Sequence, residues 1–170
     1  MKCQSLNLND YQSVVIAYHG ESDRSADVLA GSFAEHYLAT YIRHFMIADS
    51  EVERLFERGP LSTFDARINI AYAFRLITKA HRQDLLLIKD IRNRFAHSLQ
   101  LIDLQRPHIK AMIRKLSIYK TLHSQPLPPN VQKTERDIYL YSIGMFVGFA
   151  HTTIVKATKA SPETKPPEVK

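Results

Sequence analysis

The sequence predicts an all-α fold, a single-domain helical bundle of about six helices. Apolar residues recur every three or four positions in several long stretches, which is the period of an α-helix. The 170 residues include only five glycines and eight prolines, so these stretches contain few helix breakers. No segment shows the strict alternation of apolar and polar residues that is typical of a β-strand. We expect residues 1–158 to form the bundle and residues 159–170, which contain three prolines, to form a disordered tail.

Two helices are expected before residue 50. Asp10 can cap a short helix over residues 11–19, and Gly20 ends it. A much longer helix should span residues 24–48 and form one wall of the bundle. Its core stripe should consist of large apolar residues at helical spacing, namely Leu29, Phe33, Tyr37, Tyr41 and Phe45, widened by Leu38, Ile42 and Met46.

Two shorter helices should follow, each opened by a capping box. Ser50 with Glu53 opens the first, which ends at Gly59. Ser62 with Asp65 opens the second, over residues 63–77. In the second helix the helical period is followed by Phe64, Ile68, Ala71 and Tyr72, then by Arg75 and Leu76.

A helix over residues 79–97, with Thr78 as its cap, ends in a cluster of polar residues. Its core positions should be Leu85, Leu87, Ile88, Ile91 and Phe95. Asn93 and His97 are four residues apart and therefore share one face, and Arg92 lies beside that face. A histidine, an asparagine and an arginine that converge at a helix end can hold a phosphate.

This cluster has two interpretations. A metal-free ribonuclease needs a base for the ribose 2′-hydroxyl and a cation for the charge that develops on phosphorus. His97 suits the first task, Arg92 the second, and Asn93 can orient the imidazole. The alternative is structural, because Arg92 and His97 can instead bind the free carbonyls at the helix end.

Pro107 should begin the next helix, whose core residues are Ile109, Met112, Ile113, Leu116 and Tyr119. Its other side carries a basic stripe of Arg106, Lys110 and Arg114, spaced by four. Such a stripe can follow a phosphate backbone, although a solvated helix face is the more common explanation. After a proline-rich linker over residues 125–130, residues 131–156 are the most hydrophobic part of the chain.

This last segment has no charged residue from Ile138 to Val155, which reaches the lower length limit of a membrane span. Its histidine, threonines and glycines lower its hydrophobicity, so we expect a core helix and no membrane span. Gly144 and Gly148 are four residues apart and should let another helix approach closely.

Composition sets further expectations. The net charge of +6 slightly favours polyanionic partners. The one cysteine, Cys3, allows neither a disulfide framework nor a cysteine-based zinc site, and the polar N-terminus does not resemble a signal peptide. We therefore expect a cytoplasmic protein. The eight histidines show no metal-binding spacing, so no metal and no cofactor are expected.

Two segments stand out from the rest of the sequence. The first is Gly59-Pro60-Leu61-Ser62-Thr63-Phe64-Asp65-Ala66-Arg67-Ile68, followed by Ala71-Tyr72-Ala73. The second is Asp84-Leu85 with Ile91-Arg92-Asn93-Arg94-Phe95-Ala96-His97. Together, in this order and at this separation, they resemble the mannitol operon repressor (MltR) family. The likeness covers about Ser25 to Leu116, and it departs from the family at Phe74-Arg75, where a small residue and a glycine are expected.

The resemblance implies a helical bacterial protein that represses transcription of a sugar-alcohol operon. Because such proteins lack an evident DNA-binding motif, it implies action through protein partners or assembly. The Arg-Asn-x-x-x-His segment is also similar to the motif of HEPN domains, helical bundles that include metal-independent ribonucleases. That similarity implies Arg92 and His97 as a catalytic pair, with Asn93 after the arginine, and a homodimer that brings two such pairs together.

Overall fold

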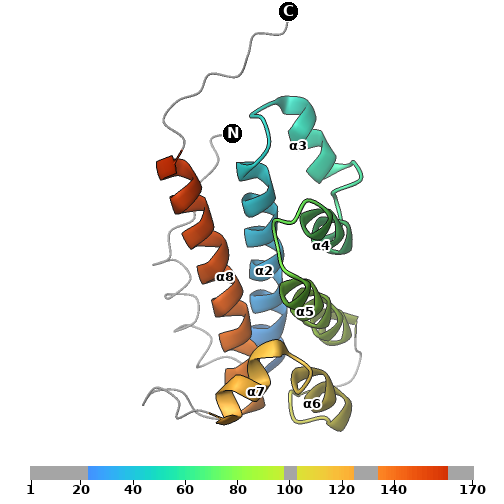
Figure 1. The fold of residues 1–170 in the computed structure, drawn as a ribbon. Helices are drawn as coiled ribbons and strands as arrows, with labels where there is room; N and C mark the ends of the chain where they lie inside the picture. The colour runs from blue at the N-terminus through green and yellow to red at the C-terminus, as the bar shows by residue number, and fades with distance from the viewer. Residues whose placement is uncertain (1–22, 98–102, 125–133, 161–170) are drawn as a thin grey trace, which may run out of the picture.

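The computed structural model describes residues 23–97, 103–124 and 134–160. These residues form seven α-helices and no β-strand (Figure 1), which confirms the prediction of an all-α bundle. The helices are α2 (Asp23–His44), α3 (Ser50–Glu57), α4 (Phe64–Ala73), α5 (Lys79–His97), α6 (Pro107–Ile113), α7 (Ser117–Ser124) and α8 (Glu135–Ala160). The expected helix over 11–19, the linker over 125–130 and residues 161–170 of the expected tail lie outside the described residues.

Helices α2 and α8 lie side by side and run in the same direction through the length of the bundle (Figure 1). Helices α4 and α5 pack on the other side of α2. Helices α6 and α7 lie at the end where α2 begins, and α3 lies at the end where α2 finishes (Figure 1). The α4 and α5 helices, which carry most of the two segments described above, are therefore both held against α2.

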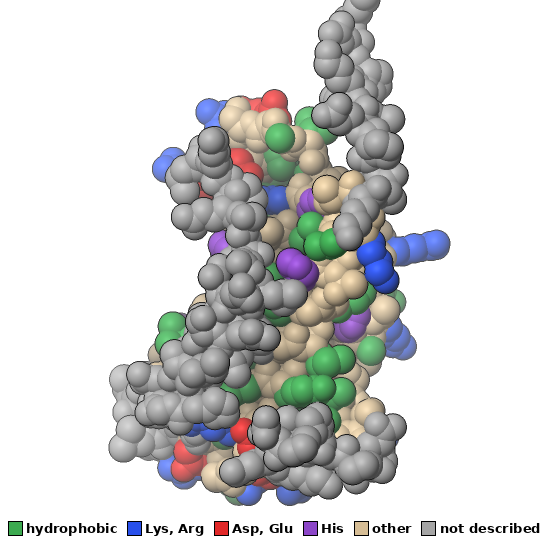
Figure 2. All heavy atoms as spheres, turned by 90° about the vertical axis from the view of Figure 1, so that its left-hand side faces the viewer, with side chains coloured by type: hydrophobic (Ala, Val, Ile, Leu, Met, Phe, Trp, Pro, Cys, Tyr) green, Lys and Arg blue, Asp and Glu red, His purple; other side chains and the backbone are tan. Residues whose placement is uncertain are grey.

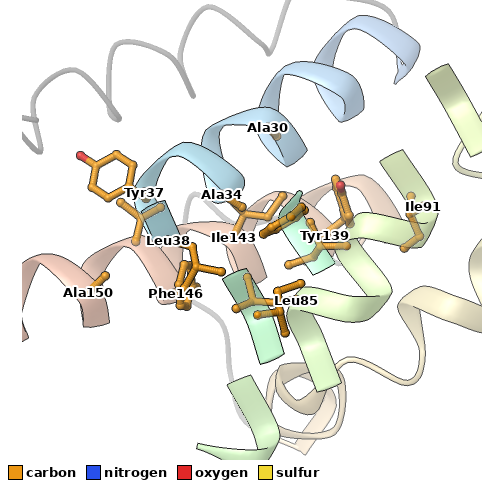
Figure 3. Packing of buried hydrophobic residues seen from close by; sticks show 14 of the residues in the cluster. Ala30, Ala34, Tyr37, Leu38, Leu85, Ile91, Tyr139, Ile143, Phe146 and Ala150 are labelled. Carbon is orange, nitrogen blue, oxygen red and sulfur yellow. The ribbon is translucent and has the colours of Figure 1, made fainter. Parts of the chain in front are cut away.

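The core lies where α2, α5 and α8 meet. Figure 3 shows Ala30, Ala34 and Leu38 of α2 packed among side chains of α8 and α5. The α8 side contributes Tyr139, Ile143, Phe146 and Ala150, all of them buried. Removal of these apolar surfaces from water is the main stabilising contribution to such a bundle.

The core face of α2 differs from the predicted one. Tyr37, Leu38, Tyr41 and Ile42 are buried as expected, but Leu29 and Phe45 are about half exposed. Three alanines take part in the core instead: Ala30, Ala34 and Ala39. Small side chains let the backbones of two helices approach closely, so the packed face is rotated toward them. The helix also ends at His44 and not at residue 48.

The two predicted capping boxes are wrong, although the helices that they open are present. Asp49 caps α3, and its carboxylate accepts a hydrogen bond from the Glu51 backbone N–H at 2.7 Å. Thr63 caps α4 by accepting from the Ala66 backbone N–H at 3.2 Å. In each case the cap lies one residue away from the predicted one, and an extended backbone at that residue places the side-chain oxygen correctly.

Helix α4 ends at Ala73, four residues earlier than predicted. Arg75 has a φ of 57°, which is the left-handed conformation. The Leu76 backbone N–H donates to the Ala71 carbonyl, and the Arg75 N–H donates to the Tyr72 carbonyl. This is the Schellman pattern of helix termination, in which the left-handed residue is usually glycine.

Helix α5 agrees with its prediction. The Thr78 hydroxyl accepts from the His81 backbone N–H at 3.1 Å, and Leu85, Ile88, Ile91 and Phe95 are fully buried. The single helix predicted after Pro107 is instead two helices, α6 and α7. The Asp84 carboxylate of α5 accepts from the backbone N–H and the hydroxyl of Ser117, and so caps α7 from a neighbouring helix.

Helix α8 continues to Ala160, so residues 159 and 160 are helical, although they were expected in the disordered tail. Among the described residues, α8 is the helix that is long and apolar enough to cross a membrane. A core helix meets the same criteria, and α8 packs against α2, α5, α6 and α7. A Cβ added at Gly148 would meet nothing within 4 Å in the described structure, so the close helix contact expected at Gly148 is wrong.

Candidate functional site

Arg92 of α5 forms an ion pair with Glu35 of α2. Its Nη1 donates to Glu35 Oε2, and its Nη2 lies 3.5 Å from Asn93 Oδ1. The guanidinium lies 5.5 Å from the centre of the Phe64 ring on α4. The side chains of Arg92 and Glu35 are only 19% and 22% exposed. Arg92 therefore joins α5 to α2 and lies beside α4.

Gly31 makes room for the stem of Arg92. A Cβ added at Gly31 would lie 2.9 Å from both Cβ and Cδ of Arg92, closer than real Cβ atoms approach their neighbours. Gly31 is also one helical turn before Glu35, so the two residues lie on the same face of α2. This face of α2 therefore contacts Arg92 at two points. Gly31 leaves space for the aliphatic part of the side chain, and Glu35 pairs with the guanidinium.

Arg67 of α4 binds the other oxygen of the same carboxylate. Its Nη1 lies 3.1 Å from Glu35 Oε1. Its remaining donors bind the backbone carbonyls of Leu61 at 2.7 Å, Ser62 at 3.2 Å and Phe56 at 3.3 Å. Burial lowers the pKa of Arg67, and the Glu35 carboxylate opposes that shift. Glu35 thus holds two arginines that are 25 positions apart in the sequence.

Of the predicted catalytic residues, the structure shows a contact between Arg92 and Asn93. His97 is exposed in the last turn of α5. Within the described residues, no hydrogen bond connects it to Arg92 or Asn93. Arg92 also differs from the structural alternative, because its partner is a carboxylate on α2 and not a free carbonyl at the end of α5.

The predicted nucleic-acid-binding stripe on α6 is partly neutralised. Lys110 Nζ lies 3.6 Å from Glu135 Oε1 of α8, and Arg114 Nη2 lies 4.0 Å from the same oxygen. Arg106 lies at the start of α6 and is exposed. Two of the three cations therefore attach α6 to α8, which reduces the charge that they can offer to a phosphate backbone.

Sequence reasoning did not identify Glu35, Gly31 or Arg67 as members of the site. A signal was present, because Glu35 is the only acidic residue between Val28 and Ala48 and Gly31 precedes it by one turn. An isolated carboxylate on a helix that packs on both sides requires a cationic partner. Within the described residues, no group of three or more histidine, cysteine or acidic side chains is placed to hold a metal ion.

Comparison with known proteins adds no relative. The chain matches no model of a protein family. No curated protein matches it, and no solved structure matches it.

Proposed function

We propose that this chain is a transcriptional regulator, a repressor of the mannitol operon repressor type that acts through protein partners or assembly. The proposal includes a cytoplasmic homodimer and no membrane span. Support comes from the two segments on which the family resemblance rests. Arg67 of the first segment and Arg92 of the second bind opposite oxygens of Glu35, so the two segments form one structural unit.

The observation that supports the proposal most is the ion pair between Arg92 and Glu35. A catalytic arginine must offer its guanidinium to a developing negative charge. In this chain the guanidinium is paired with a carboxylate and is mostly buried. A protein in which this motif joins helices is better suited to present a stable surface to partners than to perform phosphoryl chemistry.

The proposal is tested by deletion of the gene in the organism that encodes it. Transcripts of a sugar-alcohol operon should rise, and the wild-type gene should restore repression. His97→Ala should restore it equally well, because His97 is exposed and its loss leaves the bundle intact. The purified protein alone should form no sequence-specific operator complex. Unchanged transcripts in the deletion strain, or a tight and salt-resistant operator complex, would contradict the proposal.

A metal-independent ribonuclease is the second candidate, and the contact between Arg92 and Asn93 favours it. His97 follows one turn later and is accessible to a substrate, and a homodimer would supply two such sets. The test is incubation of labelled RNA with the purified protein, with and without EDTA, beside His97→Ala. EDTA-resistant cleavage that is lost in the variant would favour the enzyme. Absence of cleavage by the wild-type protein would exclude it.

A further inference from the structure

The corner between α4 and α5 is a surface of aromatic and cationic side chains. Phe74 is 69% exposed and Tyr72 is 41% exposed, both at the end of α4. Arg75 and Lys79 follow them and are exposed as well. Arg82, one turn into α5, lies over the Tyr72 ring at 5.4 Å from its centre. We call these five residues, Tyr72, Phe74, Arg75, Lys79 and Arg82, the corner surface.

This corner carries positive charge with little to balance it. No aspartate or glutamate lies between Asp65 and Asp84. Among the described residues, Arg75 and Lys79 make no ion pair and no side-chain hydrogen bond. Arg82 binds the neutral Oδ1 of Asn69 at 2.9 Å. Asp65 already binds Lys89 at 2.6 Å, and this bond lowers the pKa of Asp65. Asp84 accepts hydrogen bonds from Ser117.

Two features of the corner are unfavourable for a solvated turn, although the left-handed residue also ends α4. The Phe74 ring contacts no other aromatic ring among the described residues, although a ring of this size normally contributes to a core. Arg75 occupies a left-handed position at which glycine is the unstrained residue. A strained, charged residue beside an exposed ring is more typical of a binding surface than of a solvated turn.

From these contacts we infer that the corner surface binds single-stranded nucleic acid. Unpaired bases stack on exposed aromatic rings, and flanking cations bind the phosphates. Tyr72 and Phe74 supply the rings, and Arg75, Lys79 and Arg82 supply the cations. The predicted stripe on α6 has no aromatic residue within it and is partly paired with Glu135, so the corner surface fits this ligand better. The inference is independent of the proposed function.

The test measures fluorescence anisotropy of a labelled oligothymidylate, and of an oligouridylate, of about twelve nucleotides each. The full chain should bind both more tightly than it binds a duplex of the same length. If the three cations each bind one phosphate, a plot of the logarithm of affinity against the logarithm of salt concentration should have a slope of about −2. Phe74→Ala should weaken binding by about fivefold or more, because a base loses its stacking partner.

Arg75→Gly separates binding from folding. It should reduce the magnitude of the salt slope by about 0.7, the value for one phosphate contact on a single strand. It should also raise the thermal unfolding midpoint, because glycine relieves the left-handed strain. Loss of affinity in a more stable protein cannot result from unfolding. Met145→Ala on α8 and Lys120→Ala on α7 are the matched controls, an exposed apolar residue and an exposed cation away from the corner.

Three results would overturn the inference. The first is that Phe74→Ala and Arg75→Gly bind the oligonucleotides as tightly as the two control variants do. The second is equal affinity for single strand and duplex, which would indicate charge alone. The third is displacement of the oligonucleotide by polyglutamate as effectively as by unlabelled oligonucleotide, which would indicate an acidic protein partner.

Discussion

Arg67 and Arg92 donate to the two oxygens of a single carboxylate, that of Glu35. This arrangement joins α4 and α5 to α2 through one acidic side chain. The three side chains are 13%, 19% and 22% exposed for Arg67, Arg92 and Glu35 respectively, so water screens their charges only partly. Figure 2 shows a different face of the molecule, where hydrophobic and histidine side chains reach the surface. The mostly buried Glu35 carboxylate therefore helps to hold α2, α4 and α5 together.

Glu35→Gln should lower the free energy of unfolding by about 1–2 kcal/mol, because two mostly buried guanidinium groups lose their common counter-ion and repel each other. Urea unfolding followed by circular dichroism measures the change. Glu51→Gln is the matched control, because Glu51 pairs with Arg54 and its side chain is 71% exposed. That control should change stability by less than about 0.5 kcal/mol. Equal effects of both substitutions would show that the Glu35 pairs are as weak as a surface pair.

Gly31→Ala and Gly148→Ala should change stability in opposite directions. An alanine at Gly148 meets nothing within 4 Å of the described structure, so it should stabilise α8 by about 0.5–1 kcal/mol through its higher helix propensity. An alanine at Gly31 would displace the stem of Arg92. The destabilisation by this strain should exceed the stabilisation by higher helix propensity, so the variant should be less stable. Thermal unfolding of both variants tests the pair. A more stable Gly31→Ala would mean that Arg92 does not pack against Gly31.

Arg75→Gly should stabilise the chain by about 1 kcal/mol, because Arg75 is in the left-handed conformation. Arg58→Gly provides the control at the end of α3, where Arg58 has a φ of −134°. Glycine there relieves no strain and adds freedom to the unfolded chain, so this variant should be slightly less stable. Chemical denaturation measures both. A loss of stability in Arg75→Gly would contradict the assigned backbone conformation.

His81 should make stability depend on pH. Burial against Phe146 and Phe149 lowers the pKa of His81, while Asp84 raises it by a smaller amount. The unfolded chain, with a histidine pKa of about 6.5, therefore binds more protons than the folded chain as pH falls through that value. Stability contributed by neutral His81 is complete above that pKa and is lost as the pH decreases below it.

His81→Phe should reduce this loss, since a phenylalanine keeps the ring contacts and carries no proton. Urea unfolding at several pH values between about 7.5 and 5 measures the difference between the variant and the wild-type protein. Part of the pH dependence should remain, because burial, together with Arg43 and Arg67, also lowers the pKa of His36. Identical pH profiles would show that His81 does not titrate between the two states.

Local features of the helices could be predicted from the sequence, because they depend on neighbours within one or two turns. Thr78 caps α5 as expected, and the apolar period of α5 identifies its buried face. The left-handed conformation of Arg75 was not predicted, because the helical period was expected to continue through it to residue 77. The core face of α2 was misassigned because large residues were weighted above alanines, which decide how closely helices approach.

The partners of the candidate site could not be predicted, because they come from distant parts of the chain. Glu35 is 32 positions from Arg67 and 57 positions from Arg92. Periodicity identifies which residues share a helix face, but it does not say which faces meet. For the same reason, the pairing of Lys110 and Arg114 with Glu135 and the capping of α7 by Asp84 were not predicted.

A double-mutant cycle between Glu35 and Arg92 tests most directly whether the polar motif on α5 is a structural joint. The free energy of unfolding is measured for the wild-type protein, Glu35→Gln, Arg92→Gln and the double variant. We predict a coupling free energy of at least about 1 kcal/mol, because each residue loses its partner in either single variant. A coupling within about 0.3 kcal/mol of zero would show that Arg92 is not held by Glu35 and would contradict the structural role.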